Sequence, residues 1–201
     1  MVTENRPADE RRHEIAKALM SVVAEHGLER TTIRRVADAA GVSVGLVQRY
    51  FASKDDLLRF GIEYVYERTR ARVAAVPLDQ PEVRTIVEQI IVVQLPLNDE
   101  RAHESRVWLA FIEATLSDAT KRGIHVDATR ELLDGLTRAL AGAQRRGEMA
   151  PSLDPSQEAM ALVALMDGLV LHATATGSPF DRDTVRTAVR THLDRLFAGA
   201  R

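Results

Sequence analysis

The chain has 201 residues, of which 45% are hydrophobic and 28% charged, with 27 Lys and Arg against 29 Asp and Glu. This length and composition support one or two hydrophobic cores and exclude a disordered chain. The absence of cysteine excludes disulfides, thiolate nucleophiles and zinc–thiolate sites. The start of the chain is polar, and the most apolar stretch, residues 159–173, is interrupted by Asp167 and His172. We therefore expect a cytoplasmic protein without a membrane span.

Apolar residues recur at three- and four-residue spacing along the whole chain, and no stretch alternates with a period of two. This pattern predicts an all-α protein of about nine helices. The first helix is expected over residues 9–26, with Ile15, Leu19 and Val22 on its buried side, and it ends at Gly27.

Two short helices are expected next, joined by a glycine turn. Thr32 can cap a helix that runs to Ala40, and Gly41 can take the left-handed conformation that a helix stop needs. Ser43 can then cap a second helix to about Phe51. Together with the first helix, they predict a three-helix headpiece.

The rest of the chain predicts longer helices. Lys54 and Asp55 open a connector helix that reaches about Val76, and Pro77 and Pro81 bound a break after it. Further helices are expected over residues 83–96, 99–117, 120 or 127 to 146, 155–176 and 182–198, with breaks at Gly123, Gly147, Pro151, Gly177 and Pro179.

Two short apolar helices around a glycine turn are typical of a helix-turn-helix, whose second helix enters the DNA major groove. The apolar spacing leaves five residues of the second helix facing outward: Val44, Gly45, Gln48, Arg49 and Tyr50. Such groups fit or read a groove. Residues 1–54 hold nine Lys or Arg against seven Asp or Glu, so the part of the chain that contains these helices carries a net positive charge. The small excess favours phosphate contacts by a few placed cations.

At these residues the chain resembles the TetR family of one-component repressors. The shared pattern is a hydroxyl-capped helix, then Ala-Gly-Val-Ser, a glycine two residues on, an aromatic pair and Ser-Lys before an acidic helix start. It is met by Thr32, Ala40 to Ser43, Gly45, Tyr50, Phe51, Ser53, Lys54 and Asp55. Most members carry tyrosine where this chain has Gln48, which can bond an adenine edge instead. The DNA-binding residues predicted are Thr32, Arg34, Ser43, Val44, Gly45, Gln48, Arg49, Tyr50 and Lys54.

The resemblance implies a helix-turn-helix domain over residues 1–54 and a ligand-binding and dimerisation domain over residues 55–201. It further implies a homodimer that represses from a near-palindromic operator until a small-molecule effector releases it. The C-terminal part resembles the repressors related to the choline and betaine regulator, on Trp108-Leu109-Ala110-Phe111 and on residues 164–169. That likeness supports the fold and the dimer without naming the effector.

An effector pocket is expected between the connector helix and the helices that carry Trp108 and Met166, because apolar side chains there adjoin a few polar ones. No basic cluster accompanies them, which favours a neutral or cationic, partly apolar effector, with Glu113 and Asp167 as partners for a cation. The residues predicted are Tyr64, Gln94, Trp108, Phe111, Ile112, Thr115, Met166, Val170 and His172. Single aromatic, methionine or histidine residues on apolar faces are nevertheless core residues more often than ligand contacts.

The last two long helices carry more apolar positions than one buried stripe needs, which predicts a dimer held by a four-helix bundle. The interface residues predicted are Leu162, Leu165, Leu169, Val185, Val189, Leu193 and Leu196.

An enzyme is not supported by the spacing of reactive residues. No two of the six histidines lie three or four residues apart, and Glu100 and His103 form a single Glu-x-x-His, where a di-iron bundle needs two. No glycine-rich phosphate loop or nucleophile elbow occurs. The sequence thus predicts no cofactor and no metal. The alternative reading is a helical ligand-binding or protein-interaction module without operator binding, which only Gln48 favours.

Overall fold

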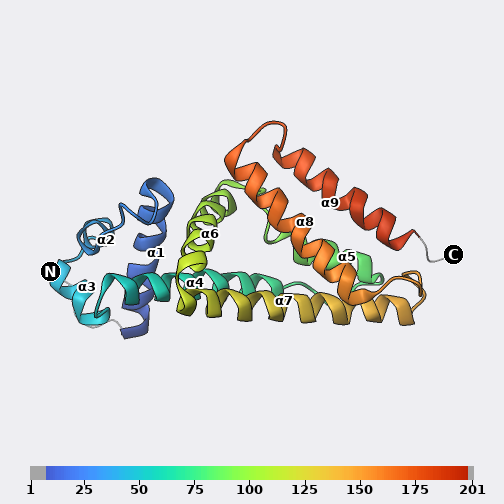
Figure 1. Cartoon of the computed structure of the whole chain (residues 1–201), viewed down its shortest axis with the longest axis horizontal. Helices are drawn as coiled ribbons and strands as arrows, with labels where there is room; N and C mark the ends of the chain where they lie inside the picture. Colours follow the sequence, from blue (N-terminus) through green and yellow to red (C-terminus); the bar gives the residue numbers. More distant parts are fainter. Residues whose placement is uncertain (1–7, 199–201) are drawn as a thin grey trace. The chain divides into compact units, whose positions relative to one another are not determined.

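The computed structural model describes residues 8–198, and within that range the chain is all-helical, as expected (Figure 1). The helices are α1 (Ala8–His26), α2 (Ile33–Ala40), α3 (Val44–Tyr50), α4 (Lys54–Ala74), α5 (Val83–Val92), α6 (Asp99–Ser117), α7 (Ala119–Arg145), α8 (Pro155–Ala175) and α9 (Arg182–Phe197).

Two of the expected boundaries were wrong. The helix expected to end near Pro96 ends at Val92, and hydrogen-bonded turns from Gln94 N to the Ile91 carbonyl oxygen and from Leu95 N to the Val92 carbonyl oxygen lead on to the proline. The break expected at Gly123 does not occur, since Gly123 lies inside α7. A glycine in a helix lowers stability by only about 1 kcal/mol, which the rest of a long helix outweighs.

The described chain divides into two compact units that differ from the predicted division at residues 54 and 55. The first unit takes the chain up to Arg68 together with Arg106–Ile124, and the second takes Thr69–Ser105 and the chain from His125 onward. Helices α4, α6 and α7 therefore each contribute residues to both units. The division at residue 54 concerns DNA-binding and effector roles, and it stays a prediction.

The first unit is built around α1, which packs on α2, while α2 packs on α3. Ile15, Leu19, Val36, Val47 and Phe51 are wholly buried there. The apolar stripes expected from residue spacing thus meet in one core, together with the first part of α4 and the last part of α6.

Helix α4 comes close to its neighbours in this unit at Gly61. A Cβ placed on Gly61 would lie 2.5 Å from Leu19 Cδ2 and 3.2 Å from Phe111 Cζ. The absence of a side chain therefore lets α4 approach α1 and α6, a role that helical spacing did not reveal.

In the second unit, α9 packs on both α5 and α8, and Figure 1 shows α8 and α9 side by side. Val87, Leu140, Leu162 and Leu193 are fully buried. By length and composition α8 is apolar enough to span a membrane, with a mean hydropathy of 1.4 over its most apolar window. A helix that forms part of a protein core can have the same property, and α8 buries one of its sides within this unit.

Candidate functional site

Local capping bonds hold the two helices of the helix-turn-helix. Thr32 Oγ1 accepts a hydrogen bond from Arg35 N at 3.2 Å, and Ser43 Oγ accepts one from Leu46 N at 3.2 Å. Gly41 ends α2 with φ of 66°, in the left-handed region that favours glycine. The two caps and the glycine stop match the sequence prediction, and they fix the direction in which α3 leaves the turn.

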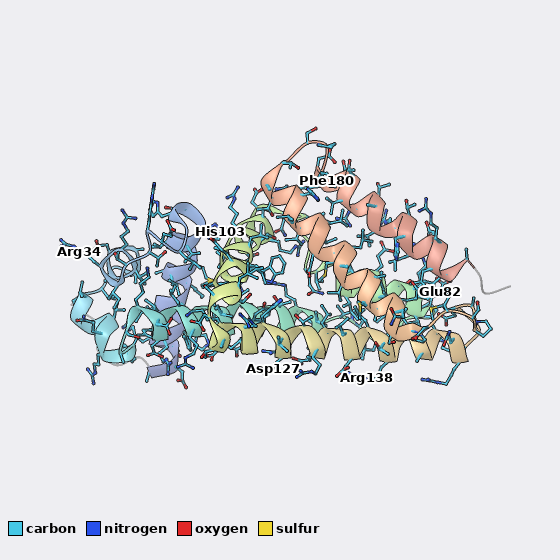
Figure 2. The ribbon with its side chains drawn as sticks, viewed as in Figure 1. Arg34, Glu82, His103, Asp127, Arg138 and Phe180 are labelled. Carbon is cyan, nitrogen blue, oxygen red and sulfur yellow. The ribbon has the colours of Figure 1, made fainter. Side chains whose placement is uncertain are left out.

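The exposed face of α3 carries the residues that the sequence predicted to face outward. Gly45, Gln48 and Arg49 are all exposed, and they fall on one face because residues three and four apart are neighbours on a helix. Val44, at the start of the helix, is 37% exposed. On the preceding helix Arg34 is also exposed and extends away from α2 (Figure 2). The exposed residues of α2 and α3 thus include an amide, two guanidinium groups, one apolar side chain and a glycine.

Two of the residues predicted to contact DNA, Tyr50 and Lys54, also make contacts within the subunit. Tyr50 is half-buried and packs against the core of the first unit, so only part of its ring is available. Lys54 Nζ donates a hydrogen bond to the Leu28 carbonyl oxygen at 3.2 Å. Lys54 therefore ties the start of α4 to the α1–α2 turn, a structural role that the sequence motif did not indicate.

A buried ion pair that sequence spacing did not indicate joins α7 to α4 in the same unit. Lys121 is only 5% exposed, and its ammonium donates hydrogen bonds to both Asp55 and Asp118. Burial opposes the charge of Lys121, but the bonds to Asp118 and Asp55 outweigh it and raise the pKa of the lysine. The bond from Lys121 in turn lowers the pKa of Asp118. The start of α4, directly after the helix-turn-helix, is thereby bound to the α6–α7 turn.

The residues predicted to line an effector pocket are divided between the two units. Tyr64 and Phe111 are buried in the core of the first unit, and Thr115 is buried with its hydroxyl donating to the Ile112 carbonyl oxygen at 2.7 Å. These three side chains pack or bond within their own unit, and their contact with an effector stays a prediction. The remaining two in this unit are half-buried: Trp108 and Ile112.

In the second unit, Met166 and Val170 are buried, whereas Gln94 Nε2 donates to the Ile90 carbonyl oxygen at 2.8 Å. His172 is exposed and stacks on Phe180, with 4.8 Å between ring centroids. The exposure of His172 is contrary to the interior position predicted for it.

Asp167, on α8, is one of the two acidic residues that the sequence predicted as partners for a cation. Burial raises its pKa from 3.8 to about 6. Among the described residues, no hydrogen bond or ion pair involves its carboxylate. Glu113, the other acidic residue predicted for this role, is exposed on α6. The described residues also contain no cluster of three or more metal-ligating side chains.

The predicted dimer-interface residues lie inside the subunit, with the exception of Leu165, which is half-buried. The six buried residues are Leu162, Leu169, Val185, Val189, Leu193 and Leu196. They stabilise packing within the second unit, so they are not available to a partner. The excess apolar surface predicted for α8 does exist, but on its opposite side.

That exposed side of α8 is apolar for most of its length. Met160 is 55% exposed and Leu171 is 46% exposed, and Ala161, Ala164 and Ala175 are exposed with them. These residues recur at three-, four- and seven-residue spacing, so they share one helical face. The polar Gln157 and His172 are exposed on the same side of α8, and Asp167, which is less exposed, lies beside it. We call the set of Met160, Ala161, Ala164, Leu171 and Ala175 the α8 apolar face.

Comparisons with known proteins identify the family. Residues 15–59 match the family described as bacterial regulatory proteins of the tetR family, and residues 83–198 match the BetI-type transcriptional repressor C-terminal family. The HTH-type transcriptional regulator BetI of Burkholderia ambifaria is 31% identical over 194 residues, covering 94% of each chain.

Two solved structures share the fold. A transcriptional regulator from Rhodococcus sp. Rha1 has a TM-score of 0.85 and 26% identity, covering 94% of this chain and 96% of that chain. A transcriptional regulator from Saccharomonospora viridis, in complex with choline, has a TM-score of 0.86 and 21% identity, covering 92% and 96%. The chain belongs to the TetR family of transcriptional regulators, which are not enzymes, and its C-terminal region is of the BetI type.

Proposed function

We propose that this regulator is a cytoplasmic repressor that binds a near-palindromic operator as a dimer and is released by a neutral or cationic small molecule. The observation that carries the proposal is the exposed face of α3, where Gln48 and Arg49 lie beside Gly45 on a capped helix. A solvated helix face accounts for single polar residues. A helix-turn-helix that presents them on its second helix supports major-groove binding.

The two polar residues on this face have different chemistry. Gln48 can donate to and accept from one adenine edge, which discriminates between bases. Arg49 carries a charge that suits a phosphate, whose position does not depend on sequence. We therefore assign base recognition to Gln48 and sequence-independent affinity to Arg49.

Selection of duplexes from a random pool by the wild-type protein tests the proposal. We expect one near-palindromic sequence to be enriched. Gln48→Ala should then weaken binding to that duplex by about 1–3 kcal/mol and relax preference at one position per half-site. Arg49→Ala should weaken binding to all duplexes and reduce the salt dependence. A protein that enriches no sequence would be the ligand-binding module without operator binding.

The α8 apolar face supports a dimer, because exposed apolar side chains gathered along one side of a helix mark an interaction surface. Two copies of α8 and α9 would then form a four-helix bundle around a two-fold axis. A symmetric pair could place its two reading helices in successive major grooves, roughly 34–36 Å apart. This dimer uses the same two helices as the sequence prediction but the opposite side of α8.

Asp167 supports a cationic group on the effector. Its carboxylate is largely removed from water and has no partner among the described residues, so a cation would relieve the cost of its burial. The fold neighbour that holds choline makes a quaternary ammonium a suitable first probe. Only an effector that binds the DNA-free form more tightly can release the operator.

A further inference from the structure

We infer that Arg12 is a positioning residue for α3, the proposed reading helix, and that it acts through Phe51 at the end of that helix. The inference rests on the proposed repressor function. Helix α3 has only seven residues, and Val47 is its one buried side chain. A helix this short has little stability of its own. Its orientation therefore depends on what holds its two ends.

The two ends of α3 are held in different ways. At its start, the Ser43 hydroxyl accepts a hydrogen bond from Leu46 N, which is a contact between neighbours in sequence. At its end, Phe51 N donates to the Val47 carbonyl oxygen at 2.9 Å, and the Phe51 ring is fully buried. That ring packs on Phe60 of α4, with 5.4 Å between ring centroids. The end of α3 is thus fixed by side chains from other helices.

Arg12, on α1, lies over both of these rings. Its guanidinium carbon is 4.5 Å from the centroid of the Phe60 ring and 5.2 Å from the centroid of the Phe51 ring. Both distances are within the range of a cation–π attraction. One side chain of α1 therefore joins the residue that ends α3 to the first part of α4.

The surroundings of Arg12 indicate that its charge interacts with the rings. Within residues 8–198 no carboxylate forms an ion pair with Arg12. Its Nε atom is buried without a hydrogen-bond partner, and an apolar side chain such as methionine would fill the same space without burying an N–H group. Packing alone thus does not account for an arginine here. A flat cation stacked on two aromatic rings does.

His13, the next residue on α1, offers a matched control. Its ring meets Phe60 edge-on at 6.0 Å and Tyr64 at 5.6 Å between ring centroids, and both of those residues belong to α4. Among the described residues, no ring contact joins His13 to Phe51. His13→Met therefore weakens the packing of α1 on α4 alone, whereas Arg12→Met also releases the end of α3.

The first measurement is amide hydrogen exchange of the full chain. In Arg12→Met we expect exchange in α3 to be about five- to tenfold faster than in the wild type, and exchange in α9 to be unchanged. Arg12→Lys keeps the cation but loses the flat stack, so it should give a smaller increase, and His13→Met should leave exchange in α3 unchanged. All three variants should melt within roughly 4 °C of the wild type, because one cation–π contact is a small part of the stability.

The second measurement is binding to the duplex that the wild type selects and to random duplexes. Arg12→Met should bind the selected duplex about tenfold more weakly, because Gln48, three residues before Phe51, loses its fixed position and must be ordered again on binding. Random duplexes should stay within about threefold with the same salt dependence, since counterion release does not require a fixed helix orientation. His13→Met should bind both duplexes like the wild type.

Wild-type affinity of Arg12→Met for the selected duplex would show that Arg12 is a core contact only. Equal losses on selected and random duplexes, with a weaker salt dependence, would show that Arg12 binds a DNA phosphate directly. Equal losses in Arg12→Met and His13→Met, or unchanged exchange in α3, would assign the effect to the packing of α1 on α4. Each of these results overturns the inference. A wild type that selects no sequence, with faster exchange in α3 of Arg12→Met, would instead reject the repressor function and keep the role of Arg12 in holding α3.

Discussion

The helix-turn-helix and the α8–α9 pair bury one side of each helix in the same way, but their exposed sides differ. The outer face of α3 is polar and carries Gln48 and Arg49, whereas the α8 apolar face carries Met160 and Leu171 without a charge. A polar groove such as that of DNA suits the first surface, and a second apolar surface suits the other. The chemistry of the exposed side, rather than that of the core, thus distinguishes the two partners.

The largest expected effect concerns the buried side of the α8–α9 pair. Val189 is 1% exposed, so Val189→Glu would place a carboxylate in the core without a partner. We expect the free energy of unfolding to fall by about 4 kcal/mol or more, which leaves little folded protein. Thermal denaturation followed by circular dichroism measures this. A stable, folded Val189→Glu monomer would show that Val189 faces a partner and not the core.

The matching change on the exposed side should separate the subunits without unfolding them. In Met160→Glu or Leu171→Glu the carboxylate stays in water in the monomer and is buried only on dimerisation. We expect the dimer to weaken by about 3 kcal/mol, or roughly 100-fold, with an unchanged helical spectrum. Sedimentation velocity at micromolar concentration measures the association.

Leu78→Glu is the control for this experiment, because Leu78 is 73% exposed but lies outside α8. It should remain a dimer. A wild type that sediments as a monomer, or a Met160→Glu variant that stays dimeric, would contradict the assignment of the α8 apolar face.

These two experiments also bear on how much of the structure could be predicted from the sequence. Features that depend on a few neighbouring residues could be predicted from the sequence: Thr32 and Ser43 cap their helices, and Gly41 ends one. The helical period also gave the all-α fold. The sequence could not show which side of α8 is buried, because both of its sides are apolar. Which apolar side is buried depends on the packing of α9. The burial of Lys121 likewise depends on a contact that is distant in sequence, because its partner Asp55 is 66 positions away.

A smaller effect is expected at Asp167, whose pKa is raised to about 6 by burial. In the unfolded chain the carboxyl ionises near pH 4, so the folded form binds more protons between about pH 4 and pH 6. This group therefore lowers stability as the pH rises through that range, and the loss is constant above it. Asp167→Asn should raise the free energy of unfolding by about 2 kcal/mol at pH 7 and by almost nothing near pH 4.

Urea denaturation across this pH range measures the difference, with Asp134→Asn, an exposed residue of α7, as the unaffected control. If Asp167 also binds the effector, choline should stabilise the wild type and not Asp167→Asn. The stabilisation of the wild type should fall below about pH 6, where the carboxylate takes up its proton. Equal stabilisation of both proteins by choline would remove Asp167 from the effector site.

The smallest expected effect compares a buried ion pair with an exposed one. Lys121 is 5% exposed between Asp55 and Asp118, whereas Arg182 pairs with Asp99 where both side chains are exposed. Lys121→Met should lower the free energy of unfolding by about 1–2 kcal/mol, because the lysine charge is shielded from water while its carboxylates keep some solvent contact. Arg182→Met should change it by less than about 0.5 kcal/mol. Urea denaturation at neutral pH measures both.

The ion pair of Lys121 should persist across neutral pH, because the pKa of Lys121 is raised and that of Asp118 is lowered. Its stabilising effect is lost only as Asp118 protonates in acid or Lys121 deprotonates in strong base. Equal effects of the two substitutions would show that the Lys121 pair stabilises the start of α4 no more than a surface contact does.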